Sequence, residues 1–267
     1  MSTLRSEDLI LKTLALVLVL ALPSSLVAQD VDNDGDVLYL VPINAPEPVP
    51  GAHGTLWVSE LWVHNGTESP LRLWTTWCPD IPVPCGATEF HAPGTTERVF
   101  GDETLSLLPA FVYRLPAATA DHVVLSSRLF ELSRLAQPVG VELPVVREDQ
   151  FFRSSSRFIA VPSASTLRSA LRVYNPRGRT AGAVNVEVVT AQGDKLGETT
   201  LSLPQTGEDE VPGFGFMPDL LAVFPQLAMV DRYDVIVTPV EDHLDYWAFV
   251  SVTDNDTQQV FTITHKN

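Results

Sequence analysis

One stretch of the chain returns later with the same spacing of residues, and this repeat limits what the chain can fold into. The first copy, residues 57–65, reads WVSELWVHN, and the second, residues 167–175, reads LRSALRVYN. Identical residues recur at matching positions: Ser59 and Ser169, Leu61 and Leu171, Val63 and Val173, and Asn65 and Asn175. Alternation with a period of two is typical of a strand with one buried face, and Asn suits the turn that follows. The sequence therefore predicts two copies of one β domain.

The blocks around this strand also occur in the same order in both copies. Each copy opens on an apolar strand, residues 37–42 in the first and 157–162 in the second. The later matches are short runs with alternating side chains: residues 71–75 with 184–188, 88–93 with 199–204, and 123–127 with 246–252. Each copy also has one short helix candidate, residues 101–109 and 217–225, bounded by the Asp and Pro residues that commonly start and stop helices.

Short alternating runs dominate the chain, with 21 Pro and 15 Gly placed largely between them and almost no long helical pattern. This pattern is typical of β-sandwiches. We predict an all-β fold of two tandem immunoglobulin-like β-sandwich domains, each with one short helix. The first domain spans residues 37–152 and the second residues 153–267. The boundary falls near residues 140–156, where residues 148–150 and 153–156 are typical of connecting chain.

Residues 1–28 have the pattern of a secretory signal peptide. Lys12 precedes an apolar run at residues 14–22, and Ala28 is a suitable cleavage position. The run is shorter than the about 20 residues that a membrane-spanning helix needs. We expect cleavage after Ala28, export to the cell exterior and no membrane insertion afterwards. The alternative is that the leader is retained as an uncleaved anchor.

The formal net charge of −16 restricts the classes of partner that the protein can bind. Phosphate backbones are bound by clustered Lys and Arg, and an acidic surface repels them. Anionic membrane surfaces are repelled for the same reason. We therefore expect no nucleic acid partner.

The only cysteines, Cys78 and Cys85, bracket a proline-rich loop. In an exported protein this arrangement favours a disulfide, whose short loop contributes about 2–3 kcal/mol on the chain-entropy model. The alternative is two unpaired thiols. A metal site is not favoured because two Cys alone lack the further ligands.

An acidic segment, residues 29–36, follows the predicted cleavage site. Its carboxylates alternate like those that open an EF-hand calcium loop: Asp30, Asp32, Asp34 and Asp36. The twelfth position, which supplies the bidentate carboxylate, is Val41 in an apolar strand. We expect calcium to bind weakly if at all, and we expect no other cofactor. The alternative is a solvated acidic tail.

The order of the blocks resembles tandem β-sandwich repeats of proteins that bacteria export, most of which have no assigned role. The resemblance rests on the Val-Pro that ends each opening strand, the Gly-Thr loop from Gly51 to Thr55, the strand that ends at Asn65, and the run SVTDN at residues 251–255. It implies an extracellular, non-catalytic module, and it supplies no site residues.

Tryptophan is concentrated in the first copy, which holds four of the five: Trp57, Trp62, Trp74 and Trp77. Because the repeat predicts that Leu61 and Val63 are buried, Trp62 points to the opposite face of its strand, together with Glu60 and His64. By the same alternation, Leu71 and Leu73 are buried, and Trp74 points outward beside Arg72.

The second copy has Arg172 and Glu187 in place of Trp62 and Trp74, which fits a solvated cross-strand ion pair. If the two strands are neighbours in one sheet, the two indoles form an exposed aromatic surface. Such a surface binds a glycan or a protein, with His64 and Arg72 as polar edges. The alternative is that these tryptophans pack beneath the proline-rich loop or against the second copy.

Catalytic motifs are absent from the sequence: it has no Gly-x-Ser-x-Gly and no His-Glu-x-x-His. We expect no enzyme activity. The pairs Asp121-His122 and Asp242-His243 fit a repeated turn better than a metal site, because Asp side chains bond to nearby backbone amides in turns. Three hypotheses remain: a binding or adhesion module, a structural spacer of a surface assembly without a ligand, and a hydrolase that uses Asp121 and Asp242.

Overall fold

A computed structural model describes residues 35–45, 47–74, 88–99, 108–133, 140–178, 180–205 and 212–265 of the 267-residue chain. Residues 35–267 form one compact unit. The predicted signal peptide, Asp30, Asp32 and Asp34 of the acidic segment, and both Cys78 and Cys85 lie outside the described residues. Cleavage, calcium binding and the disulfide therefore stay predictions.

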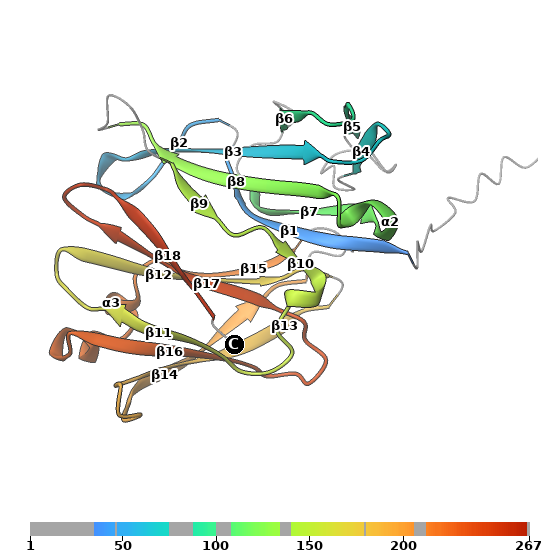
Figure 1. Cartoon of the computed structure of the whole chain (residues 1–267). Coiled ribbons are helices and arrows are strands. Elements are labelled where there is room, and N and C mark those ends of the chain that lie inside the picture. Colours follow the sequence, from blue (N-terminus) through green and yellow to red (C-terminus); the bar gives the residue numbers. More distant parts are fainter. Residues whose placement is uncertain are drawn as a thin grey trace, which may run out of the picture. The chain divides into compact units, whose positions relative to one another are not determined.

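Two antiparallel sheets are built from the first half of this unit (Figure 1). The β1 sheet has the order β10-β1-β7-β4-β5, with β1 (Asp36–Asn44), β4 (Leu71–Trp74), β5 (Thr88–His91), β7 (Leu108–Pro116) and β10 (Val146–Arg147). The β3 sheet has the order β2-β3-β8-β9, and β6 also pairs with β3; its strands are β2 (Val49–Pro50), β3 (Leu56–Asn65), β6 (Thr96–Val99), β8 (Val123–Glu131) and β9 (Val141–Leu143).

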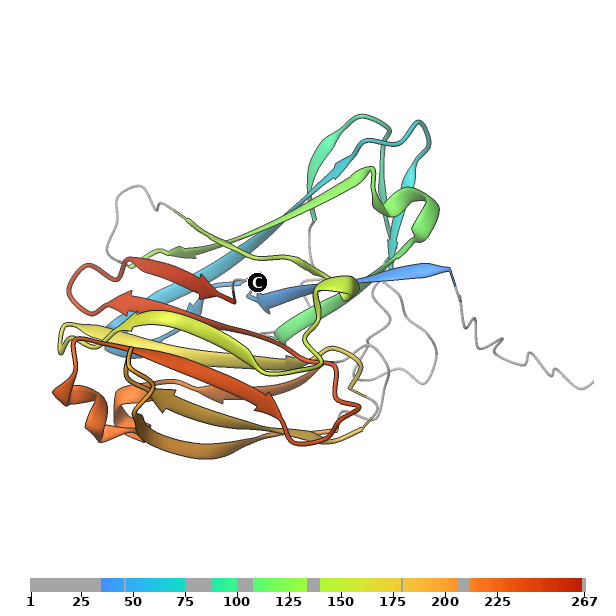
Figure 2. The same ribbon diagram turned by 60° about the horizontal axis from the view of Figure 1, so that its bottom comes forward.

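The second half forms two further antiparallel sheets, seen from another side in Figure 2. The β16 sheet has the order β11-β16-β13-β14, with β11 (Ser156–Pro162), β13 (Gly182–Val189), β14 (Lys195–Leu203) and β16 (Arg232–Pro239). The β12 sheet has the order β15-β12-β17-β18, with β12 (Leu167–Asn175), β15 (Gly213–Met217), β17 (Trp247–Asp254) and β18 (Val260–Thr264).

The strand order of the first half is repeated in the second. The run β1-β7-β4-β5 corresponds to β11-β16-β13-β14, and β6-β3-β8-β9 corresponds to β15-β12-β17-β18. Leu61 on β3 and Leu171 on β12 therefore lie on equivalent strands, as the sequence repeat requires. The predicted all-β fold is confirmed.

Helices are few and short among the residues that the structure describes. They are α2 (Ala117–Ala120), α3 (Leu220–Val223) and the 3-10 turns η1 (Ala52–Gly54), η2 (Glu148–Gln150) and η3 (Pro225–Met229). The α3 helix lies within the predicted range 217–225, and the Asp219 carboxylate caps it by accepting a hydrogen bond from the Leu221 amide. None of the helices in the described part of the chain is long and apolar enough to cross a membrane.

One local prediction was wrong in part, and two short strands were missed. Residues 101–107 of the first helix candidate lie outside the described residues, but Leu108 and Pro109 begin β7. The α-helix among the described residues of this half is α2. Near the predicted boundary, the sequence did not predict β9 and β10, which pair with β8 and β1. These strands were missed because two or three residues are too few to show alternation.

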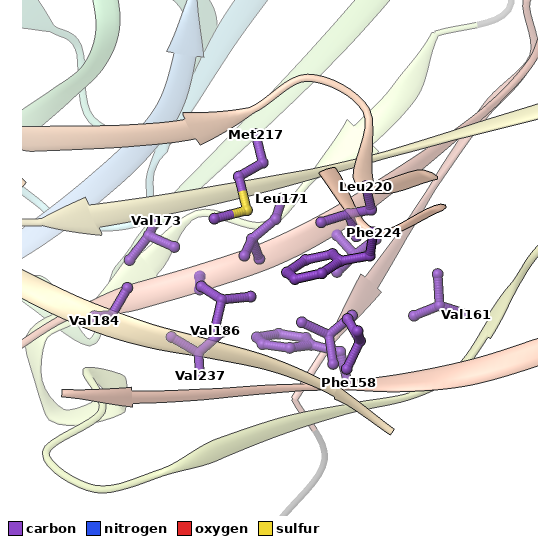
Figure 3. Close-up of a cluster of buried hydrophobic side chains, with 14 of the residues drawn as sticks. Phe158, Val161, Leu171, Val173, Val184, Val186, Met217, Leu220, Phe224 and Val237 are labelled. Carbon is purple, nitrogen blue, oxygen red and sulfur yellow. The ribbon is translucent and has the colours of Figure 1, made fainter. Parts of the chain in front are cut away.

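Three clusters of buried side chains hold the unit together. One lies between the β1 and β3 sheets and includes Val41 and Val63. Another lies between the β12 and β16 sheets and includes Phe158 and Leu171 (Figure 3). The third, which we call the joining cluster, combines residues of both halves: Leu38, Leu40, Ala110, Val112, Leu129, Leu143, Val146, Phe151, Tyr174, Trp247 and Phe249.

Strand β1 is buried on both faces, which explains its uninterrupted apolar sequence VLYLV. Val37, Tyr39 and Val41 belong to the core of the first sandwich. Leu38 and Leu40 alternate with them and belong to the joining cluster.

The second half contributes aromatic rings to the joining cluster. Tyr174 of β12 stacks on Trp247 and Phe249 of β17, with ring centroids 6.1 and 6.4 Å apart. All three rings point away from the core of their own sandwich, which holds their strand neighbours Val173 and Ala248. The two halves therefore share one apolar core.

Leu40→Ala is expected to destabilise both halves together. Leu40 is fully buried in the joining cluster, so its truncation should lower the free energy of unfolding by about 2–5 kcal/mol. Calorimetry should show a single transition that moves to lower temperature. The control Val124→Ala, at a 59% exposed position, should change the free energy by no more than about 0.5 kcal/mol. Two transitions, with only one shifted, would show that the joining cluster does not couple the halves.

The buried tyrosines are expected to lower the stability of the folded protein at alkaline pH. Burial raises the pKa of Tyr39 and Tyr174, and it raises the pKa of Tyr233 and Tyr246 to about 12. Each folded-state pKa lies above the unfolded value near 10, so the stabilisation is complete below about pH 10 and is lost as pH rises towards 12. Phenolate absorbance should therefore appear together with unfolding measured by circular dichroism. Ionisation of most tyrosines near pH 10 in folded protein would contradict this.

Candidate functional site

The outward side of the β3 sheet is the candidate site, and we call it the Trp62 face. Its side chains come from three neighbouring strands: Glu60, Trp62 and His64 of β3, Thr96 and Arg98 of β6, and Val124, Ser126 and Arg128 of β8. Leu61 and Val63 are buried in the core, so the predicted outward direction of Trp62 is confirmed.

Trp62 is held in place by a carboxylate that also binds an arginine. The indole is 37% exposed, and its Nε1–H donates to Glu60 Oε2 at 3.2 Å. The other oxygen, Glu60 Oε1, lies 3.3 Å from Arg98 Nη1. Arg98 and Ser126 stand opposite Trp62 on the two neighbouring strands. The indole therefore presents an apolar surface between polar groups whose positions are already fixed.

His64 and Val124 extend the Trp62 face towards the end of β3. His64 Nδ1 lies 2.9 Å from Thr96 Oγ1, and Val124 on β8 stands directly opposite His64. The face thus offers hydrogen-bond donors and acceptors around two exposed apolar side chains.

The condition for an aromatic pair, that the strands of Trp62 and Trp74 are neighbours in one sheet, is not met. Trp74 ends β4, which pairs with β5 and β7 in the β1 sheet, whereas Trp62 is in the β3 sheet. The chain crosses from one sheet to the other between β3 and β4, as Greek-key connections do. The side chains of Trp74 and Arg72 lie outside the described residues. Leu71 and Leu73 are buried as expected.

The other tryptophans have different environments. Trp57 is half-buried, packs against the joining cluster and donates from Nε1 to Thr55 Oγ1 at 2.8 Å. Trp247 is buried in the joining cluster, and Trp77 lies outside the described residues. Packing against the second half therefore accounts for Trp57 but not for Trp62.

The expected ion pair between Arg172 and Glu187 is also wrong, because β12 and β13 belong to different sheets. The Arg172 guanidinium lies over the rings of Phe216 and Phe249, 4.6 and 5.7 Å from their centroids. Its Nη1 donates to Ser251 Oγ at 2.6 Å. Burial lowers the pKa of Arg172.

The two Asp-His pairs lie in turns, as predicted. Asp121 and His122 follow α2, and Asp242 and His243 join β16 to β17. These are equivalent turns of different sandwiches, and Asp121 forms an ion pair with Arg147 at 2.5 Å. The structure therefore does not pair these carboxylates in one site. Within the described ranges, no three His, Cys, Asp or Glu side chains are grouped to hold a metal ion.

Sequence reasoning missed Arg98, Val124 and Ser126. Arg98 was missed because β6 is only four residues long and had not been assigned. Its run Thr-Glu-Arg-Val alternates and ends in buried Val99, which was a usable signal. Val124 and Ser126 follow from alternation along β8 once the direction of Val123 is known, because successive side chains of a strand point to opposite faces.

Asn65, at the end of β3, is bonded to β5 and to the turn that leads into β6, the strand that carries Arg98. Its amide Nδ2 donates to the carbonyls of Ser69 and His91, both at 2.9 Å, and its Oδ1 accepts from Thr67. Since His91 belongs to β5, Asn65 also links the two sheets of the sandwich. The recurrence of Asn in the sequence repeat thus has a structural cause.

The two repeat asparagines offer a matched pair of variants. Asn65→Ala removes several bonds, among them those to the backbone carbonyls of Ser69 and His91, so it should cost about 2–3 kcal/mol of unfolding free energy. Asn175→Ala removes the bond from Nδ2 to the Thr180 carbonyl, at 2.9 Å, and should cost about 1 kcal/mol. Chemical denaturation of both variants measures the difference. Equal costs would show that Asn65 does not organise the Trp62 face more strongly than its counterpart organises the second half.

Comparison of the chain with family models, with curated proteins and with solved structures finds no match.

Proposed function

We propose that this is a secreted or cell-surface, non-catalytic binding module that contacts a glycan or a protein through the Trp62 face. The observation that supports this is a difference between the two halves. The outward side of the β12 sheet, which corresponds to the Trp62 face, places Tyr174, Trp247 and Phe249 in the joining cluster. In the first half the corresponding side leaves Trp62 and Val124 exposed.

The chemistry of the Trp62 face suits both kinds of partner. An indole stacks on the apolar side of a sugar ring, while Glu60, Arg98 and Ser126 can bond to hydroxyl groups around it. At protein interfaces, Trp is enriched among the residues that carry most of the binding energy, and a polar rim commonly surrounds it. A glycan and a protein would therefore both use Trp62 as the central contact.

A structural spacer is the second candidate, because the joining cluster makes the two sandwiches one unit. A spacer that grew by repeating this contact would need an apolar face for the next sandwich. The outward side of the β1 sheet has such a face, including Leu38 and Val112. The corresponding side of the β16 sheet is mostly polar: Arg157, Asn185, Glu187, Glu198 and Thr200. Terminal repeats commonly carry polar outer faces, which favours a self-contained pair.

Trp62→Ala should abolish most of the binding. The full chain would be screened on a glycan array and against a surface-protein extract of the producing cells, and affinities for hits would be measured by calorimetry. Truncating a central Trp anchor commonly costs about 2 kcal/mol, which corresponds to an about 30-fold loss of affinity. The control Ile159→Ala, at an exposed position on β11, should bind as the wild type does.

The outcomes separate the candidates. A ligand bound equally by the wild type and Trp62→Ala would refute the role of the Trp62 face. Absence of any ligand in both screens would favour the spacer. Saccharide hits alone identify a glycan module, and extract hits alone identify a protein partner.

A further inference from the structure

Two arginines lie on the outward side of β12, four residues apart. Arg168 and Arg172 point to the same face because strand side chains alternate, and only Ala170 lies between them on that face. On the neighbouring strand β17, Thr253 is opposite Arg168 and Ser251 is opposite Ala170. Both hydroxyl residues are buried. Arg172 Nη1 donates to Ser251 Oγ at 2.6 Å, so the Arg172 side chain extends along β12 towards Arg168.

Neither arginine forms an ion pair with a carboxylate in the part of the chain that the structure describes. Both side chains are half-buried, and Arg168 Nη1 is buried without a hydrogen-bond partner among the described groups. Other arginines of this acidic chain do pair: Arg153 Nε lies 2.9 Å from Asp245, and Arg157 Nη2 lies 2.7 Å from Asp234. Arg168 and Arg172 are thus partly buried without the carboxylate partner that Arg153 and Arg157 have.

The arrangement is costly without a counter-charge. Two neighbouring cations repel each other, and a buried N–H donor without an acceptor loses its bond to water. The charge of Arg168 indeed contributes to lowering the pKa of Arg172. The rings of Phe216 and Phe249 stabilise one guanidinium, but they accept no bond from the free donor of the other. An oxyanion would supply both negative charge and several acceptors.

We propose that Arg168 and Arg172 form a binding site for an oxyanion, a carboxylate, sulfate or phosphate group, with the Ser251 hydroxyl bound to Arg172 as a further polar contact. The site is particular to the second half, because the corresponding residues of the first half are Val58 and Trp62. It is also independent of the Trp62 face, which is on another sheet.

The experiment uses the full chain with sulfate, phosphate or acetate, against chloride at matched ionic strength. Calorimetric titration measures binding, and thermal unfolding measures the stabilisation that binding produces. The wild type should bind at least one of the three anions and gain stability relative to chloride. The Arg168→Gln variant should bind it at least about tenfold more weakly, because a charge-assisted contact is lost. Comparison of the three anions distinguishes a carboxylate site from a sulfate or phosphate site.

Arg232→Gln is the matched control, because Arg232 is exposed on β16 in the same half. It should retain the full anion effect, which separates binding at the site from general charge screening. Arg168→Lys keeps the charge and guards against a folding defect of the Gln variant, and it should bind more weakly than the wild type because Lys lacks the forked donors. Equal anion binding by the wild type and Arg168→Gln, or no binding by the wild type beyond chloride, would overturn the proposal.

Discussion

The contact of Leu38 and Leu40 with the aromatic rings of Tyr174, Trp247 and Phe249 is the interaction on which the other features of the molecule depend. It buries the second face of β1 and the outward side of the β12 sheet together, so a strand of the first sandwich becomes part of two cores. The contact covers the outward side of the β1 sheet in the first half and that of the β12 sheet in the second. The outward side of the β3 sheet takes no part in it, and Trp62 stays exposed there. The candidate site is therefore a consequence of how the repeats are joined.

Much of the fold could be predicted from alternation within the repeat. The spacing of Leu61 and Val63, matched by Leu171 and Val173, identifies both the strand and its buried side, because period-two patterns directly report which side chains share a face. The same pattern does not say which strands are neighbours, since sheet order depends on contacts that are distant in sequence. Trp62 and Trp74 were therefore placed together although their strands lie in different sheets.

Alternation also does not show what covers the outward side of a strand. In the sequence, Arg172 and Trp62 occupy the same repeat position, and both were predicted to face solvent. In the structure Trp62 does so, whereas Arg172 is packed on Phe216. The second half differs because the first sandwich covers part of its β12 sheet. The sequence signal for this contact is the apolar run of β1, and β12 itself does not carry it. Arg98 and Arg168 were missed for a related reason: their importance comes from neighbours on other strands.

The shared core also has a consequence for the order in which the chain becomes structured. Trp247 and Phe249 lie near the C-terminal end of the sequence, whereas Leu38 and Leu40 lie near the start of the described residues. During synthesis from the N-terminus, the first sandwich would be complete while the outward side of its β1 sheet was still uncovered. Intermediates that expose apolar surface and unpaired edges are prone to aggregate. For this protein, the risk of aggregation is therefore highest before β17 has been synthesised. A chain truncated before Trp247 would keep that apolar surface exposed permanently.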